Sequence, residues 1–127
     1  MKYIVESSKS VADAVHDLEA AITARNFGVM HTHNLHATLN NKGVPFEPQC
    51  QVLEVCNPHQ AAKVLSQDMD MNMALPCRVS VYQKNGVTHI GTLLPSQLLA
   101  SLSDSDALKT VASEVEEVLL SAIDAAR

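Results

Sequence analysis

Apolar residues along this chain follow two different spacings, which predict strands in some segments and helices in others. Residues 2–7 alternate around Tyr3, Ile4 and Val5, as a half-buried strand does. An apolar stripe at helical spacing follows Ser10, whose side chain we expect to cap the helix, and Asn26 and Gly28 end it. The same two patterns predict strands at 28–36, 49–56, 77–83 and 87–93 and helical segments at 58–67, 95–102 and 106–126.

Turn-forming residues separate these elements. Asn85-Gly86 lies between the last two strands and is a strong signal for a two-residue hairpin. Residues 40–48 combine Asn, Gly and Pro and predict an irregular segment, and 68–75 predict a methionine-rich connector. The predicted order is β-α-β-β-α-β-β-α, which indicates an α+β fold with a mainly antiparallel sheet and helices packed on one face. Neither a repeat nor a linker divides the chain, so we expect one domain over residues 1–127.

Composition and charge exclude some classes of partner. The 127 residues are 46% hydrophobic but only 3% aromatic, and the formal net charge is −5. A chain without a basic run and with few aromatic rings for base stacking is not expected to bind nucleic acid. No apolar stretch approaches the length of a membrane span or a signal peptide, so we expect a cytoplasmic protein without a membrane partner. In the cytoplasm, three cysteines indicate free, metal-binding or redox-active thiols rather than disulfides.

Two cysteines stand at the ends of predicted strands. Cys56 directly precedes Asn57-Pro58, which predicts a helix N-cap and first turn, and a helix N-terminus there would favour the thiolate. Cys77 alternates with the apolar residues of its strand and is therefore expected to face the core. Cys50 lies six residues before Cys56, about 20 Å along a strand, so the two are not expected to share a ligand. The alternative interpretation of Cys56 and Cys77 is that they are small buried hydrophobes.

Two charged residues stand beside these cysteines. Glu54 is expected on the same strand face as Cys50, Val52 and Cys56, where it is a candidate general base or ligand. Arg78 follows Cys77 and is a candidate partner for Glu54 or for an anion. A salt-bridged surface residue is the alternative interpretation of Glu54. The predicted ligand-binding set is therefore Cys56, Cys77, Glu54 and Arg78, with Cys56 and Glu54 as candidate catalytic residues if the protein is an enzyme.

Two further motifs contain possible metal ligands. Val29, His31 and His33 are expected on one face of their strand, and His-x-His spacing can present two imidazoles to one ion. A metal set of Cys56, Cys77, His31 and His33 would suit a thiophilic ion, Cu or Zn. Met69, Met71 and Met73 form an M-x-M-x-M motif whose thioethers could bind Cu(I), although such methionines more often fill gaps in a core.

The chain also resembles the domain of unknown function 302 family. Its most specific motifs are Glu54–Pro58 (EVCNP) and Leu75–Arg78 (LPCR). The other residues that carry the resemblance are Gly28 to His33, Thr38-Leu39, Lys42-Gly43, Phe46, Cys50, Ala61-Ala62 and Val81-Tyr82. The resemblance implies a small α+β fold related to the TATA-binding-protein-like half-domain and homodimers with an exchanged segment. It implies no reaction.

Three functions fit these features. The first is a small binding protein that holds a soft ligand, a thiophilic metal ion or a sulfur species, on Cys56 and Cys77. The second is a thiol redox or sulfur-transfer enzyme with Cys56 as nucleophile, and the third is a structural or partner-binding domain with core cysteines. Whether any reaction is catalysed stays open at this point.

Overall fold

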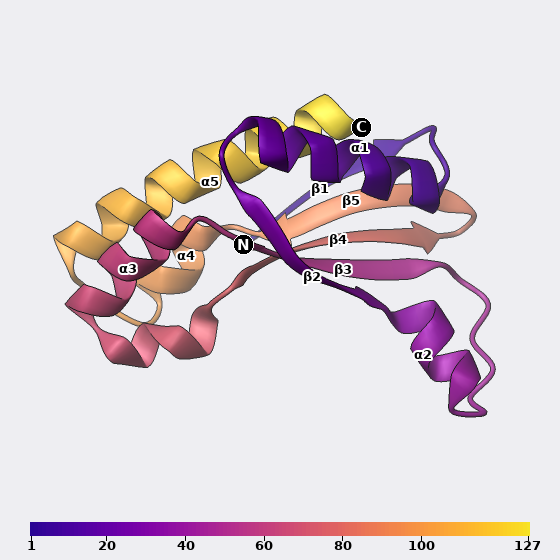
Figure 1. Cartoon of the computed structure of the whole chain (residues 1–127), viewed down its shortest axis with the longest axis horizontal. Helices are drawn as coiled ribbons and strands as arrows, with labels where there is room; N and C mark the ends of the chain where they lie inside the picture. The colour runs from indigo at the N-terminus through magenta and orange to yellow at the C-terminus, as the bar shows by residue number, and fades with distance from the viewer.

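The computed structural model describes residues 1–127 and has one five-stranded antiparallel sheet with helices on one face (Figure 1). Its strand order is β1-β5-β4-β3-β2. The α+β class is therefore confirmed. The strands are β1 (Lys2–Ser7), β2 (Gly28–Asn34), β3 (Cys50–Cys56), β4 (Cys77–Lys84) and β5 (Val87–Leu93). The helices are α1 (Val11–Ala24), α2 (Leu35–Asn41), α3 (Pro58–Gln67), the 3₁₀ helix η1 (Met69–Ala74), α4 (Pro95–Ala100) and α5 (Asp106–Ala126).

Local signals account for most of these boundaries. The Ser10 side chain accepts a hydrogen bond from the Asp13 amide at the start of α1, as a capping residue does. Asn85 and Gly86 both have positive φ, 53° and 77°, which is the conformation that a tight hairpin turn between β4 and β5 requires. No helix is both long and apolar enough to cross a membrane.

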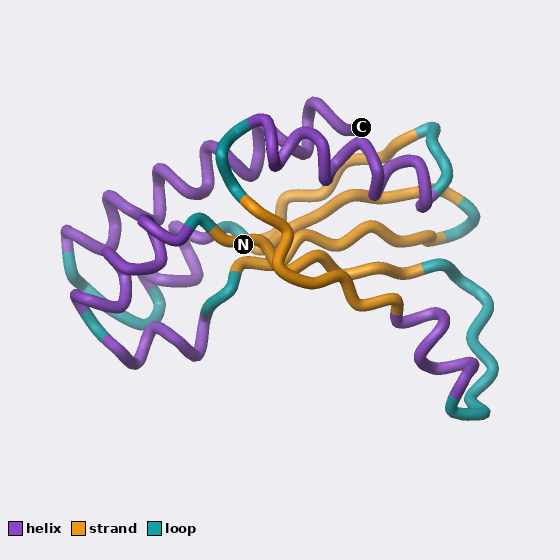
Figure 2. The backbone as a smooth tube through the Cα atoms, in the orientation of Figure 1, coloured by secondary structure: helices purple, strands orange, loops and turns teal.

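The core lies between one face of the sheet and the helices. Alternate residues of the central strands, such as Leu53 and Val79, are completely buried, and α1 packs against both of these strands. Each such aliphatic side chain contributes about 1.5–3 kcal/mol by leaving water. Figure 2 shows the two long helices over one side of the strands, while the other side of the sheet carries no helix. This uncovered side is called the open face below.

Two predicted boundaries are wrong. The strand predicted at 28–36 ends at Asn34, and the chain continues as α2, which the predicted order lacked. The Asn34 side chain accepts from the Ala37 amide and caps this helix, which has no buried residue. The predicted connector at 68–75 is mostly the 3₁₀ helix η1. Together with the loop to β3, α2 forms an arm over residues 35–49 that stands away from the sheet (Figure 1).

A β-bulge in β2 changes which residues share a face. Val29 pairs with Val55, yet His31 pairs with Glu54, so Met30 is an extra residue between two ladder positions. Val29 packs against the core, whereas His31 and His33 lie with Glu54 and Val52 on the open face. The expectation that Val29, His31 and His33 share one face is therefore wrong, because strict alternation breaks at Met30.

Candidate functional site

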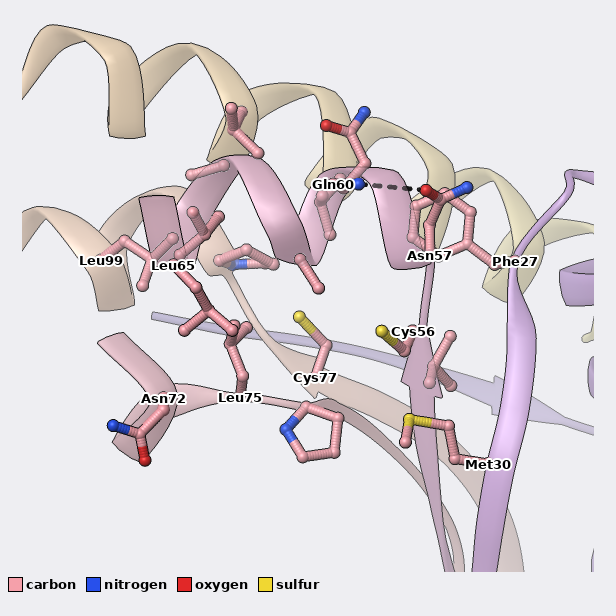
Figure 3. A pocket seen from close by; sticks show the side chains of 18 residues that line it. Phe27, Met30, Cys56, Asn57, Gln60, Leu65, Asn72, Leu75, Cys77 and Leu99 are labelled. Atoms are coloured by element: carbon pink, nitrogen blue, oxygen red, sulfur yellow. Dashed lines mark hydrogen bonds between the residues drawn. The ribbon is translucent and has the colours of Figure 1, made fainter. Parts of the chain in front are cut away.

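Cys56 and Cys77 come together at one end of the sheet. Cys56 is the last residue of β3, and Cys77 is the first residue of the neighbouring strand β4, where it pairs with Val55. Both thiols are directed toward α3, which starts two residues after Cys56 (Figure 3). The adjacency of β3 and β4 in the sheet therefore creates the pair of thiols.

The two thiols line an apolar cavity of about 250 Å³ between the sheet end and helices α3, α4 and α5. Thirteen of its eighteen lining residues are hydrophobic, and none carries a charge. Met30, the bulge residue of β2, adds a third sulfur to the same lining (Figure 3). Nothing in the sequence pattern indicated Met30, since a bulge residue cannot be located before the strand register is known.

Burial keeps both thiols protonated near neutral pH. Burial, together with a smaller contribution from the neighbouring Cys56, raises the pKa of Cys77 to about 11. Burial also raises the pKa of Cys56. The expectation that the helix N-terminus favours a Cys56 thiolate is therefore wrong.

The start of α3 explains why the helix N-terminus does not lower the pKa of Cys56. Asn57 Oδ1 accepts a hydrogen bond from the amide of Gln60, at 3.1 Å (Figure 3). It also accepts one from the amide of His59, at 3.0 Å, and Pro58 has no amide hydrogen to offer. The free N–H groups that would stabilise a thiolate are thus already satisfied by the cap. The same residues that predicted a helix start also remove its effect on the thiol.

Glu54 lies apart from the cavity, on the open face. Its Oε1 is 2.9 Å from His33 Nε2, and this hydrogen bond is the main cause that lowers the pKa of Glu54. Arg78 lies directly opposite Glu54 in the ladder and lowers the pKa of this carboxyl further. The predicted set of four residues is therefore divided: Cys56 and Cys77 line the cavity, whereas Glu54 and Arg78 are paired positions outside the lining of this cavity.

The histidines belong to this second group. The rings of His31 and His33 meet edge to face with centroids 4.4 Å apart, close to Glu54. They do not line the cavity that holds the thiols. The predicted metal set of Cys56, Cys77, His31 and His33 is thus divided between the cavity at the end of the sheet and the open face, because the bulge places the histidines on the open face.

The other candidate ligands are also dispersed. No group of three or more His, Cys, Asp or Glu side chains is placed so that it could hold one metal ion. Met71 is buried in the core, while Met69 and Met73 of the same motif are exposed. Cys50 pairs with Tyr82, far along β3 from Cys56, and burial raises the pKa of its thiol. All three thiols are free.

Comparisons with known proteins support one family. The chain has 34% identity to the protein in a structure described as "Crystal structure of uncharacterized conserved protein DUF302 from Bacillus stearothermophilus", with a TM-score of 0.93 over 99% of this chain and 98% of that one. No curated protein matches the chain. The family model described as Domain of unknown function DUF302 matches residues 3–126. The chain therefore belongs to the DUF302 family.

Proposed function

We propose that the chain is a small binding protein that holds a soft ligand between Cys56 and Cys77. One observation carries this proposal: two thiols from neighbouring strands line a single cavity without any charged residue. Met30 adds a thioether to this lining, so three sulfur atoms border the same space.

These donors suit a thiophilic monovalent ion such as Cu(I). Thiolate and thioether ligands select Cu(I), whereas Mg(II) and Ca(II) require oxygen donors that this lining does not offer in charged form. A single thiolate neutralises a monovalent ion, which lowers the cost of placing charge in an apolar cavity. Structural Zn(II) sites use four ligands, and the histidines that could complete such a set lie on the open face. Copper is therefore favoured over zinc.

The protonated thiols make a catalytic role a weaker alternative. A nucleophilic cysteine requires a lowered pKa or an adjacent base, and the pKa of both thiols is raised. Metal binding instead displaces the thiol proton, so the affinity for Cu(I) should increase with pH. A thiol redox or sulfur-transfer enzyme and a structural domain with core cysteines remain the two rival functions.

An anaerobic Cu(I) titration against a competing chromogenic chelator tests the proposal. We expect one bound ion per chain and at least a tenfold weaker affinity in Cys56→Ser and Cys77→Ser, because each variant removes one of only three sulfur donors. Cys50→Ser is the matched control and should bind as the wild type does. Unchanged binding in Cys56→Ser would remove copper from consideration.

Intact mass of protein purified without reductant then separates the rivals. A persulfide on Cys56 or a reversible Cys56–Cys77 disulfide would support thiol chemistry. Unmodified thiols together with no bound metal would leave the structural role. The copper proposal requires unmodified thiols that bind Cu(I) when it is supplied.

We also propose that the chain forms a homodimer in which the arm at 35–49 packs on or exchanges with a partner copy. Its helix α2 buries no residue, and the arm exposes Leu35, Val44 and Phe46. A second copy that covered these side chains would remove apolar surface from water. A monomer by light scattering at micromolar concentration would overturn this proposal, and Phe46→Asp should weaken a dimer that uses the arm.

Three smaller proposals concern location, partners and ancestry. Three free thiols suit a reducing compartment, so we place the protein in the cytoplasm. The net charge of −5 supports the absence of a nucleic-acid partner. An antiparallel sheet with helices on one face is consistent with a relationship to the TATA-binding-protein-like half-domain.

A further inference from the structure

A second cavity, of about 650 Å³, lies beside the smaller one and shares part of its wall. Its lining comes from η1, α4 and the ends of β4 and β5. Leu75, Pro76 and Cys77 belong to the lining of both cavities, whereas Cys56 lines only the smaller one. Cys77 is therefore the sulfur-containing residue that the two cavities have in common.

The methionine-rich motif of η1 contributes two more sulfur-containing side chains to the second cavity. Met71 and Met73 line it together with Cys77, whereas Met69 of the same motif does not. Met71 is almost completely buried and Met73 is 80% exposed, so one of the two faces solvent and the other lies in the interior. A thioether is a soft, uncharged ligand that suits Cu(I). The second cavity therefore offers the same kind of donor that Met30 adds to the smaller one.

The charges that line the second cavity favour a cation. Asp68 and Asp70 come from the start of η1, and Arg78 is the one basic residue of the lining. No ion pair joins Arg78 to either acid. Arg78 lies directly opposite Glu54 in the ladder and lowers the pKa of that carboxyl. Surplus negative charge around a concave space raises the local concentration of cations. The lining of the smaller cavity has no charge, so this attraction acts at the second cavity.

We propose that Cu(I) enters through the second cavity on Met73 and Met71 and reaches the thiol pair through Cys77. This inference rests on the proposed Cu(I) function and adds the route by which the ion is loaded. The transfer is a ligand exchange in which copper stays Cu(I) throughout. The thioether–copper bonds break, a copper–thiolate bond to Cys77 forms, and the thiol proton passes to water. Cys77 can accept the ion from one cavity and hold it in the other because it lines both.

Direct entry past Met30 is the competing route, because Met30 lines the smaller cavity and is 65% exposed. The two routes depend on different methionines. Loss of the Met73 thioether should slow only loading through the second cavity and leave the final site intact. Loss of the Met30 thioether removes a donor of the final site and should weaken the equilibrium affinity.

Stopped-flow mixing of the metal-free protein with Cu(I) under anaerobic conditions tests the route. Cu(I) is supplied as its cationic acetonitrile complex, and the ultraviolet absorption of the copper–thiolate bond reports its arrival at the thiols. We expect Met73→Leu to load about tenfold more slowly than the wild type, since it loses the exposed soft donor and keeps a side chain of similar volume. Its equilibrium affinity in the chelator titration should be unchanged, because Met73 does not line the smaller cavity.

Met69→Leu is the matched control for the thioether. Met69 belongs to the same motif and is 64% exposed but does not line the cavity, so this variant should load as fast as the wild type. Asp70→Asn tests the attraction of the cation. It removes one of the two acids of the lining and should slow loading at low salt, and the difference from the wild type should disappear at high salt.

The outcomes distinguish a wrong route from a wrong function. Equal loading rates of Met73→Leu and the wild type, equal slowing by Met69→Leu, or an Asp70→Asn variant that loads at the wild-type rate in low salt would each overturn the route and leave the Cu(I) site in place. A wild-type protein that binds no Cu(I) at equilibrium would overturn both. Circular dichroism of the variants confirms that the fold is retained.

Discussion

Cys56 and Cys77 line one cavity although the sheet places neither directly opposite the other: Cys77 faces Val55 in the ladder, and Cys56 pairs with Gly28 on the other side. The two thiols therefore approach each other through the ends of their strands rather than through a cross-strand pair. The start of α3 contributes Asn57 and Gln60 to the lining of this cavity.

The two thiols should differ in their rates of alkylation in the native protein. Burial raises the pKa of both, but that of Cys77 reaches about 11 from an ordinary 9.0, so its thiolate is about a hundredfold rarer than that of a free cysteine. Iodoacetamide followed by mass spectrometry should show Cys56 modified first. Equal rates should appear only after denaturant is added, and faster modification of Cys77 in the native protein would contradict the structure.

The stability of the fold should decrease at alkaline pH because of Cys77. The thiol titrates near 9.0 in the unfolded chain and near 11 in the folded one, so the unfolded chain loses its proton first. The contribution of the protonated Cys77 thiol to the free energy of unfolding is therefore complete below about pH 9. It is lost as the pH rises through 11, by about 3 kcal/mol in total. Urea unfolding of Cys77→Val should show a smaller loss over this range than the wild type. Cys50→Val serves as the control for removal of a more accessible thiol.

The contribution of Glu54 to stability should be lost at acid pH rather than at alkaline pH. The His33 hydrogen bond lowers the pKa of its carboxyl below 4.5, so the folded state favours the charged form. This contribution is present above the unfolded pKa of about 4.3 and is lost as the pH falls through the folded value. Glu54→Gln should therefore reduce the acid dependence of unfolding below about pH 5. Glu47→Gln, at an exposed carboxylate without an ion pair, should not change it.

Neighbouring residues of β3 should respond differently to truncation. Leu53 is completely buried under the helices, so Leu53→Ala should lower the free energy of unfolding by about 2–5 kcal/mol through lost burial and a cavity. Val52 lies on the open face and is only half-buried, so Val52→Ala should cost clearly less. Chemical denaturation of both variants measures the difference, and equal losses would show that the open face is covered in solution.

Much of the fold could be predicted because short signals agreed with the apolar pattern. Ser10 caps α1 and Asn85-Gly86 forms the hairpin turn, both where the sequence indicated. Helix α2 could not be predicted from periodicity, because it buries no side chain and therefore needs no apolar stripe. Its one available signal is Asn34, which caps it and is also the last residue of β2.

The candidate site could be predicted only in part. Strand ends and alternation placed Cys77 toward the core and Cys56 next to a helix start, and the structure bears out both positions. The pairing of β3 with β4, which brings the thiols together, depends on long-range strand order. The electrostatics at Cys56 depend on Asn57, whose side chain uses the amides that a thiolate would need.

The extra residue at Met30 acts on β2 as a single-nucleotide insertion acts on a reading frame. After Met30, every side chain of the strand lies on the side of the sheet opposite to the one that strict alternation through Met30 would predict. Deletion of Met30 alone would remove the bulge and leave a regular strand in which His31 directly follows Val29, so His31 and His33 would stay on the open face and Thr32 on the core face. A homologous chain that lacks this one residue would thus present the same histidines on the open face, whereas a chain that kept the residue without the bulge would turn them toward the core.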